Sequence, residues 1–101
     1  MSLFGGVNLK KELDSTEYTM LTKSLEIVNK KWPAGDGHRE KALILLNKIE
    51  SGKRLDKKEL KLAAGYIRLC LEIMKLFDDR GADDEKFHVY GNALAEKIQN
   101  M

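Results

Sequence analysis

The sequence predicts an all-α fold: a compact four-helix bundle-like domain built around a long, nearly fully buried third helix. Apolar residues recur at three- and four-residue spacing in four segments, which is typical of amphipathic helices. Residues that begin or end helices bound each segment. The 101 residues, 43% of them hydrophobic, are enough for one domain with one core. We expect residues 14–101 to form this domain and residues 1–13 to form a flexible N-terminal tail.

The first predicted helix covers residues 14–31. Asp14 and Glu17 have the spacing of a capping box, in which each side chain accepts a hydrogen bond from the backbone N–H of the other residue. Pro33 disfavours helical geometry at Trp32, so the helix should end near Lys31. Its apolar stripe consists of Tyr18, Leu21, Leu25, Val28 and Trp32.

The second and fourth predicted helices have equally clear boundaries. The second runs from about His38 to Glu50, and Gly52 follows as a left-handed C-terminal cap. The fourth begins near Asp83 or Asp84, where acidic residues suit the positive end of the helix dipole. Its predicted stripe is Phe87, Tyr90, Leu94 and Ile98. Gly91 shares this face and should allow another helix to approach closely.

The third predicted helix, about residues 56–80, is the most informative. A second capping-box pair, Asp56 and Glu59, begins it, and Gly81 ends it. Its polar or small positions trace one narrow line, and nearly every other side chain is apolar. A helix that exposes polar side chains to solvent along only one line must be covered by other helices on its remaining sides. The line consists of Lys61, Gly65, Arg68, Glu72, Lys75 and Asp79.

The pattern also predicts which side chains form the core. Two of them, Ile67 and Cys70, lie at the centre of the third helix. The full predicted core is Leu21, Leu25, Val28, Trp32, Leu46, Ile49, Ala63, Ile67, Cys70, Met74, Phe87, Leu94 and Ile98.

Composition excludes several classes of protein. The net charge of +2 and the ample apolar content argue against intrinsic disorder. No apolar run approaches the roughly 18–20 residues of a membrane span, and no secretory signal begins the chain. The lone cysteine, Cys70, cannot form an internal disulfide and fits a reducing compartment. We therefore expect a cytoplasmic protein without membrane contact.

The sequence contains only weak matches to metal-binding or catalytic motifs, and we expect neither an enzyme nor a cofactor. Glu85 and His88 have the Glu-x-x-His spacing of di-metal helical bundles, but such sites need a second copy of the motif. The acidic residues between 78 and 85 lack the alternating ligands of a calcium loop and are better explained as helix ends. Neither Cys70 nor any serine lies in a nucleophile motif. We therefore assign no catalytic, metal or cofactor residue.

The functional hypothesis is a small non-enzymatic helical module for protein–protein interaction or regulation. It rests on apolar residues that lie outside the predicted buried stripes of the helices. Apolar side chains left exposed in this way indicate a contact surface. The candidate partner-binding residues are Met20, Ile27 and Ile44, together with Leu3 and Phe4 of the tail. The partner is another protein or a second copy of the chain, and the long third helix favours the homodimer.

The alternative is a nucleic-acid-associated factor. Residues 38–61 contain eight Lys or Arg against four Asp or Glu. Cationic side chains bind phosphates, and the second and third helices resemble a helix-turn-helix in outline. The nearly all-apolar third helix and the small net charge disfavour this function. The residues that would carry it are Lys53, Arg54, Lys57, Lys58 and Lys61.

Overall fold

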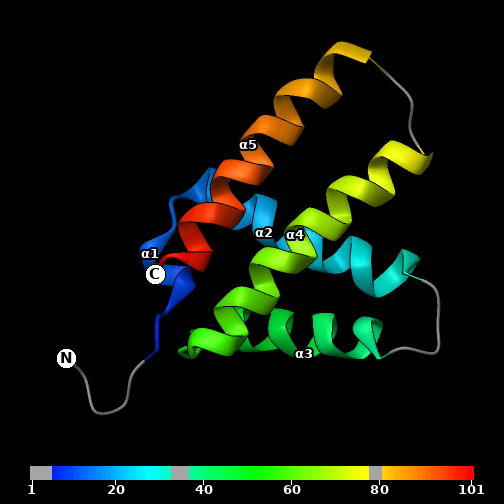
Figure 1. Cartoon of the computed structure of the whole chain (residues 1–101). Coiled ribbons are helices and arrows are strands. Elements are labelled where there is room, and N and C mark those ends of the chain that lie inside the picture. Colours follow the sequence, from blue (N-terminus) through cyan, green and yellow to red (C-terminus); the bar gives the residue numbers. More distant parts are fainter. Residues whose placement is uncertain (1–5, 33–36, 78–80) are drawn as a thin grey trace.

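The computed structural model describes residues 6–32, 37–77 and 81–101, although the side chains of 75–77 and 81–87 lie outside that description. Within these ranges all regular structure is helical, which confirms the predicted all-α class (Figure 1). Four helices correspond to the four predicted ones, and a short additional helix precedes them. The elements are α1 (Leu9–Glu12), α2 (Ser15–Lys31), α3 (His38–Glu50), α4 (Lys57–Phe77) and α5 (Gly81–Gln99).

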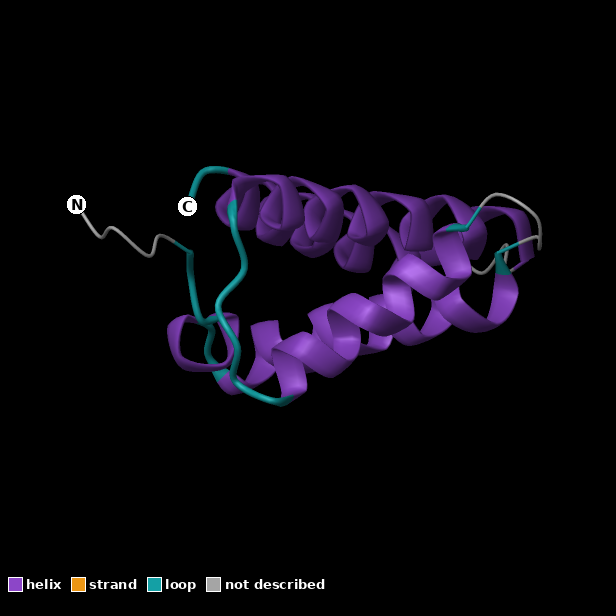
Figure 2. Ribbon diagram, turned by 90° about the horizontal axis from the view of Figure 1, so that it is seen from below, coloured by secondary structure: helices purple, strands orange, loops and turns teal. Residues whose placement is uncertain are grey.

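Two antiparallel hairpins make up the fold. Helices α2 and α3 form one hairpin, and α4 and α5 form the other (Figure 1). Figure 2 shows the two hairpins as two layers, with the core between them. Helix α4 packs on α5 within its own layer and on α2 and α3 across the core. It is therefore the central helix of the domain.

The predicted ends of α2 are confirmed by its hydrogen bonds. Asp14 Oδ1 accepts from the backbone N–H of Glu17 at 2.8 Å, and Glu17 Oε1 accepts from the N–H of Asp14 at 3.0 Å. Trp32 is extended, with φ −68° and ψ 137°, so the helix ends at Lys31 as the following proline requires. Local sequence chemistry alone accounts for both boundaries.

The narrow polar line on α4 is also confirmed. Lys61, Arg68 and Glu72 are exposed, and Gly65 is half-buried. The side chain of Lys75 and all of residues 78–80 lie outside the description. Beside this line Leu62 and Leu69 are half-buried. The buried residues of the helix are Leu60, Ala63, Ala64, Tyr66, Ile67, Cys70, Leu71 and Ile73.

Most of the predicted core is buried, with three differences. Trp32 and Met74 are only half-buried against the edge of the core. The side chain of Phe87 lies outside the described ones. The remaining ten predicted positions are buried, namely Leu21, Leu25, Val28, Leu46, Ile49, Ala63, Ile67, Cys70, Leu94 and Ile98.

Helix α5 differs from the prediction in its start and in its buried face. It begins at Gly81, which was predicted to end the preceding helix, and not at Asp83 or Asp84. Tyr90 was expected in the buried stripe but is 37% exposed. Gly91 takes the buried position, because its lack of a side chain brings the backbone of α5 onto its neighbours. The buried face of α5 consists of Gly91, Leu94, Ala95 and Ile98.

The expected flexible tail is corrected by the structure for residues 6–13. Leu9 on the inner face of α1 is 0% exposed, and Leu13, the extended residue that follows this helix, is 6% exposed. Asn8 caps this helix by accepting from the N–H of Lys10 at 3.1 Å. Residues 1–5, with the predicted contacts Leu3 and Phe4, lie outside the described residues.

Polar contacts fasten α5 to the rest of the domain. Lys97 Nζ lies 2.8 Å from Glu17 Oε2, which links the last turn of α5 to the first turn of α2. Hydrogen bonding to the Glu17 carboxylate raises the pKa of Lys97. Arg68 Nη1 donates to Gln99 Oε1 at 2.8 Å, linking α4 to α5. These exposed contacts orient the hairpins, whereas apolar burial supplies most of the stability.

Two helical glycines provide a matched test of this packing. A Cβ at Gly91 would lie 2.8 Å from Met20 Cε and 3.0 Å from Leu71 Cδ1, whereas a Cβ at Gly65 would meet nothing within 4 Å. Gly65→Ala should therefore raise the free energy of unfolding by about 0.5–1 kcal/mol, the usual gain in helix propensity. Gly91→Ala should instead lower the free energy of unfolding by about 1 kcal/mol, because the added methyl group overpacks the core.

Urea denaturation of both variants measures these differences. Equal stabilisation by the two substitutions would contradict the close approach of α5 to α2 and α4 at Gly91.

Candidate functional site

The candidate site is built on the turn between α3 and α4. Gly52 adopts φ +74°, the left-handed geometry expected of a glycine cap, and its N–H donates to the carbonyl of Ile49. Asp56 Oδ1 then accepts from the N–H of Glu59 at 2.8 Å, and Glu59 Oε1 accepts from the N–H of Asp56 at 3.0 Å. Leu55 between these caps is fully buried. The turn is therefore anchored at both ends and in the middle.

The N-terminal segment is fastened to this turn. Val7 and Leu55 exchange two backbone hydrogen bonds of 2.9 Å as an isolated antiparallel bridge. Asn8 Nδ2 donates to the carbonyl of Gly52 at 2.9 Å, and Lys10 Nζ donates to the carbonyl of Glu50 at 3.0 Å. Figure 2 shows the two loop segments running side by side at one end of the molecule. This contact brings α1 next to the end of α3.

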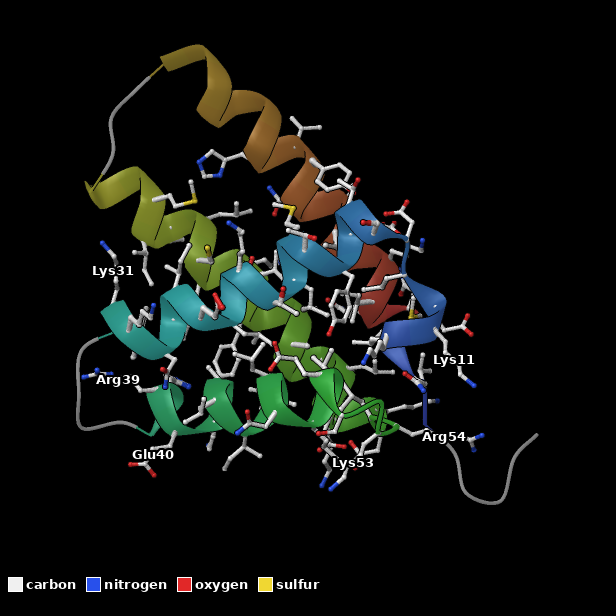
Figure 3. The ribbon with its side chains drawn as sticks, turned by 180° about the vertical axis from the view of Figure 1, so that it is seen from behind. Lys11, Lys31, Arg39, Glu40, Lys53 and Arg54 are labelled. Atoms are coloured by element: carbon white, nitrogen blue, oxygen red, sulfur yellow. The ribbon has the colours of Figure 1, made fainter. Side chains whose placement is uncertain are left out.

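A basic cluster results at this end of the molecule. We define it as the five exposed residues Lys53, Arg54, Lys57, Lys58 and Lys61. In the part of the chain that the structure describes, none of the five forms an ion pair with a carboxylate. Lys11 of α1 shares a surface hollow of about 570 Å³ with Arg54, and Figure 3 shows Lys11, Arg54 and Lys53 at the same end of the molecule. The structure thus brings the predicted nucleic-acid residues together and adds a lysine that the sequence analysis had assigned to the tail.

A groove connects this cluster with the outer surface of α3. It has a volume of about 340 Å³ and passes from Ile44 to Lys53. Lys48 on its wall pairs with Glu59 Oε2 and so joins α3 to α4. Since Glu59 Oε1 already accepts from Asp56, both carboxylate oxygens are engaged. The groove is lined by Ile44, Asn47, Lys48, Ser51, Lys53 and Glu59.

Leu43 and Ile44 form an exposed apolar pair on α3, and Ile44 lines the other end of the groove. They are 43% and 62% exposed, whereas the opposite face of α3 enters the core. We call these two residues with Asn47, also exposed, the outer face of α3. Their position follows from the helical period, which points 43, 44 and 47 away from the buried positions 42, 45, 46 and 49.

The three predicted partner-binding residues do not share one surface. Met20 is 5% exposed, because it fills the space left by Gly91 on α5, so it is corrected to a core residue. Ile27 is half-buried against the core. Ile44 alone among the three is strongly exposed. The sequence analysis did not name Leu43, which is also exposed on the outside of α3.

A second exposed apolar pair lies on α5. Val89 is 68% exposed and Tyr90 37% exposed. Partial burial, with the nearby negative charges of Asp14 and Glu17, raises the pKa of the Tyr90 hydroxyl. No groove among the described hollows is lined by this pair. It provides a comparison surface for the outer face of α3.

Three aromatic rings meet where α2, α3 and α4 come together. His38 Nδ1 lies 2.9 Å from the hydroxyl of Tyr66, and the two rings are edge-on at 5.5 Å. Trp32 packs edge-on against His38 at 5.7 Å. A buried tyrosine hydroxyl needs a polar partner, and His38 supplies it. The sequence contained no signal for this pairing, because the two residues are separated by 28 positions.

Cys70 is fully buried, as predicted. Burial raises the pKa of its thiol, and a hydrogen bond with Ser24 opposes part of that rise. The thiol is therefore protonated at neutral pH and is a poor nucleophile. Its chemistry is that of a core residue.

Across the described residues, no three or more His, Cys, Asp or Glu side chains gather closely enough to hold a metal ion. The Glu85 side chain of the Glu-x-x-His pair lies outside the description. None of the described helices is both long and apolar enough to cross a membrane.

Comparison with protein-family models, with curated proteins and with solved structures finds no significant match to the chain.

Anchoring of the N-terminal segment is testable at Asn8. Asn8→Ala removes the cap of α1 and the bond to Gly52, so the free energy of unfolding should fall by about 1–2 kcal/mol. Lys11→Ala, at an exposed neighbouring position, should change it by less than about 0.5 kcal/mol. Urea denaturation compares the two. Equal stability of both variants would contradict docking of α1 on the α3–α4 turn.

Proposed function

We propose that the protein is a small, non-enzymatic helical module that binds a protein partner through the outer face of α3. The observation that carries the proposal is the outer face of α3, where Leu43 and Ile44 are both exposed and Ile44 lines a groove. A single exposed apolar residue is ordinary, but an apolar pair beside a hollow provides the desolvated anchor that protein interfaces use. The surface is small, which suits a short segment of the partner and a regulated contact.

Two observations support a non-enzymatic role. Cys70, the strongest nucleophile by residue type, is buried and protonated. His38 is engaged by Tyr66 and Trp32. The buried lone thiol also fits a reducing compartment, and we propose the cytoplasm as the location.

A second copy of the chain is one partner of this class. Two copies could bury Leu43 and Ile44 against each other in a symmetric contact. The homodimer expected from the sequence stays a prediction, and sedimentation velocity over a range of protein concentrations tests it.

The second candidate function is nucleic-acid association. The observation in its favour is that Lys11 of α1 shares a hollow with Arg54, so cations from α1 and from the α3–α4 turn lie at one end of the molecule (Figure 3). Phosphate contacts release counterions, so the binding constant should then fall steeply with salt, whereas apolar docking gives a nearly flat response.

Exchange of Ile44 for aspartate tests the main proposal. Ile44→Asp places a charge in the apolar contact and should weaken partner binding by about tenfold or more, since hot-spot residues contribute more than about 1 kcal/mol. Val89→Asp makes the same change at an equally exposed apolar position on α5 and should leave binding unchanged.

The measurement is a pull-down of tagged protein from its native lysate, divided into nuclease-treated and untreated halves. A protein partner that survives nuclease, is lost with Ile44→Asp and is kept with Val89→Asp supports the proposal. Loss of the bound material on nuclease treatment would favour nucleic acid. Equal retention by both variants would contradict the role of α3.

A further inference from the structure

We propose that the partner segment bound on α3 is acidic and amphipathic. In this arrangement an apolar side chain of the segment packs on Leu43 and Ile44, and its carboxylates lie over the basic cluster. The inference rests on the proposed function and specifies the chemistry of the partner.

The groove determines the layout of such a segment. Ile44 of α3 and Ser51 at its C-cap both line it, and their seven-position separation corresponds to about 10 Å at 1.5 Å per residue. Lys53 lies at the far end of the same groove. An occupant two to three helical turns long therefore reaches from the apolar pair to the first cation of the basic cluster.

The charges at the far end are unbalanced. Lys48 is paired with Glu59, and Asp56 caps the first turn of α4, so these groups are already engaged. The five cations of the basic cluster have no ion pair within residues 6–32, 37–77 and 81–101. Neighbouring like charges repel, and a partner that brings carboxylates relieves this repulsion as it binds.

The apolar end of the groove favours a protein over a nucleic acid. A phosphate backbone could neutralise the cluster, but it offers nothing apolar to cover Ile44, which is 62% exposed. An acidic amphipathic segment matches both ends of the groove.

Site-specific photocrosslinking tests the inference in the full chain. A benzophenone amino acid replaces Asn47, an exposed residue that lines the groove, and a second protein carries it at Val89 as the control. Each is irradiated in nuclease-treated native lysate, and mass spectrometry identifies the crosslinked peptide. We expect position 47, but not position 89, to crosslink to a peptide with net negative charge and apolar residues.

Charge reversal then connects the adduct to the basic cluster. Lys53→Glu with Lys57→Glu should reduce the adduct yield roughly tenfold, because it turns attraction into repulsion. Lys53→Arg with Lys57→Arg keeps the charge and should preserve the yield. Lys30→Glu with Lys31→Glu makes the same charge change at the C-terminal end of α2, where Lys31 lies far from Lys53 in Figure 3, and should also preserve it.

The remaining outcomes separate this inference from the proposed function. A crosslinked peptide that is neutral or basic would overturn the inference. An adduct yield that is unchanged by Lys53→Glu with Lys57→Glu would also overturn it. Both outcomes would leave α3 as a protein-binding surface. A crosslink to a second copy of the chain would overturn the external partner in favour of self-association. An adduct only with nucleic acid in untreated lysate, or no adduct at position 47, would overturn both.

Discussion

Burial of α4 is the constraint to which the other helices conform. Its apolar side chains face every direction except one narrow line, so no single neighbour can cover them. Helix α5 covers it from within its own layer, and α2 and α3 cover it across the core. Gly91 shows how close this packing is, because even a methyl group there would collide with Met20 and Leu71. The positions of the surface features follow from this arrangement.

The candidate site depends on what α4 leaves uncovered. Its first turn emerges from the core at the α3–α4 turn, and there the polar residues of the basic cluster reach solvent. Anchoring of the N-terminal segment through Val7 and Asn8 holds that turn and adds Lys11 to the same end. Because α3 gives its inner face to the core, its outer face remains free to present Ile44. A rigid, mixed apolar and basic surface results.

The sequence predicted what local chemistry determines. Both capping boxes, the Gly52 cap and the end of α2 before Pro33 follow from a few adjacent residues, and each is confirmed. Features that depend on contacts between distant residues were predicted less well. Met20 was assigned to the surface because its burial requires Gly91, seventy-one positions away on α5. Helix α1 was missed because four residues are too few for a periodic signal, and the Val7–Leu55 bridge spans 48 positions.

Native-state hydrogen exchange tests the central role of α4 most directly. If α4 is the enclosed helix, the backbone amides of residues 63–71 should exchange only through global unfolding. Their exchange free energy should then equal the value from urea denaturation, while the amides of α1 exchange at a lower free energy. Exchange of residues 63–71 as fast as that of α1 would contradict the account, because it would show that α4 opens without unfolding of the domain.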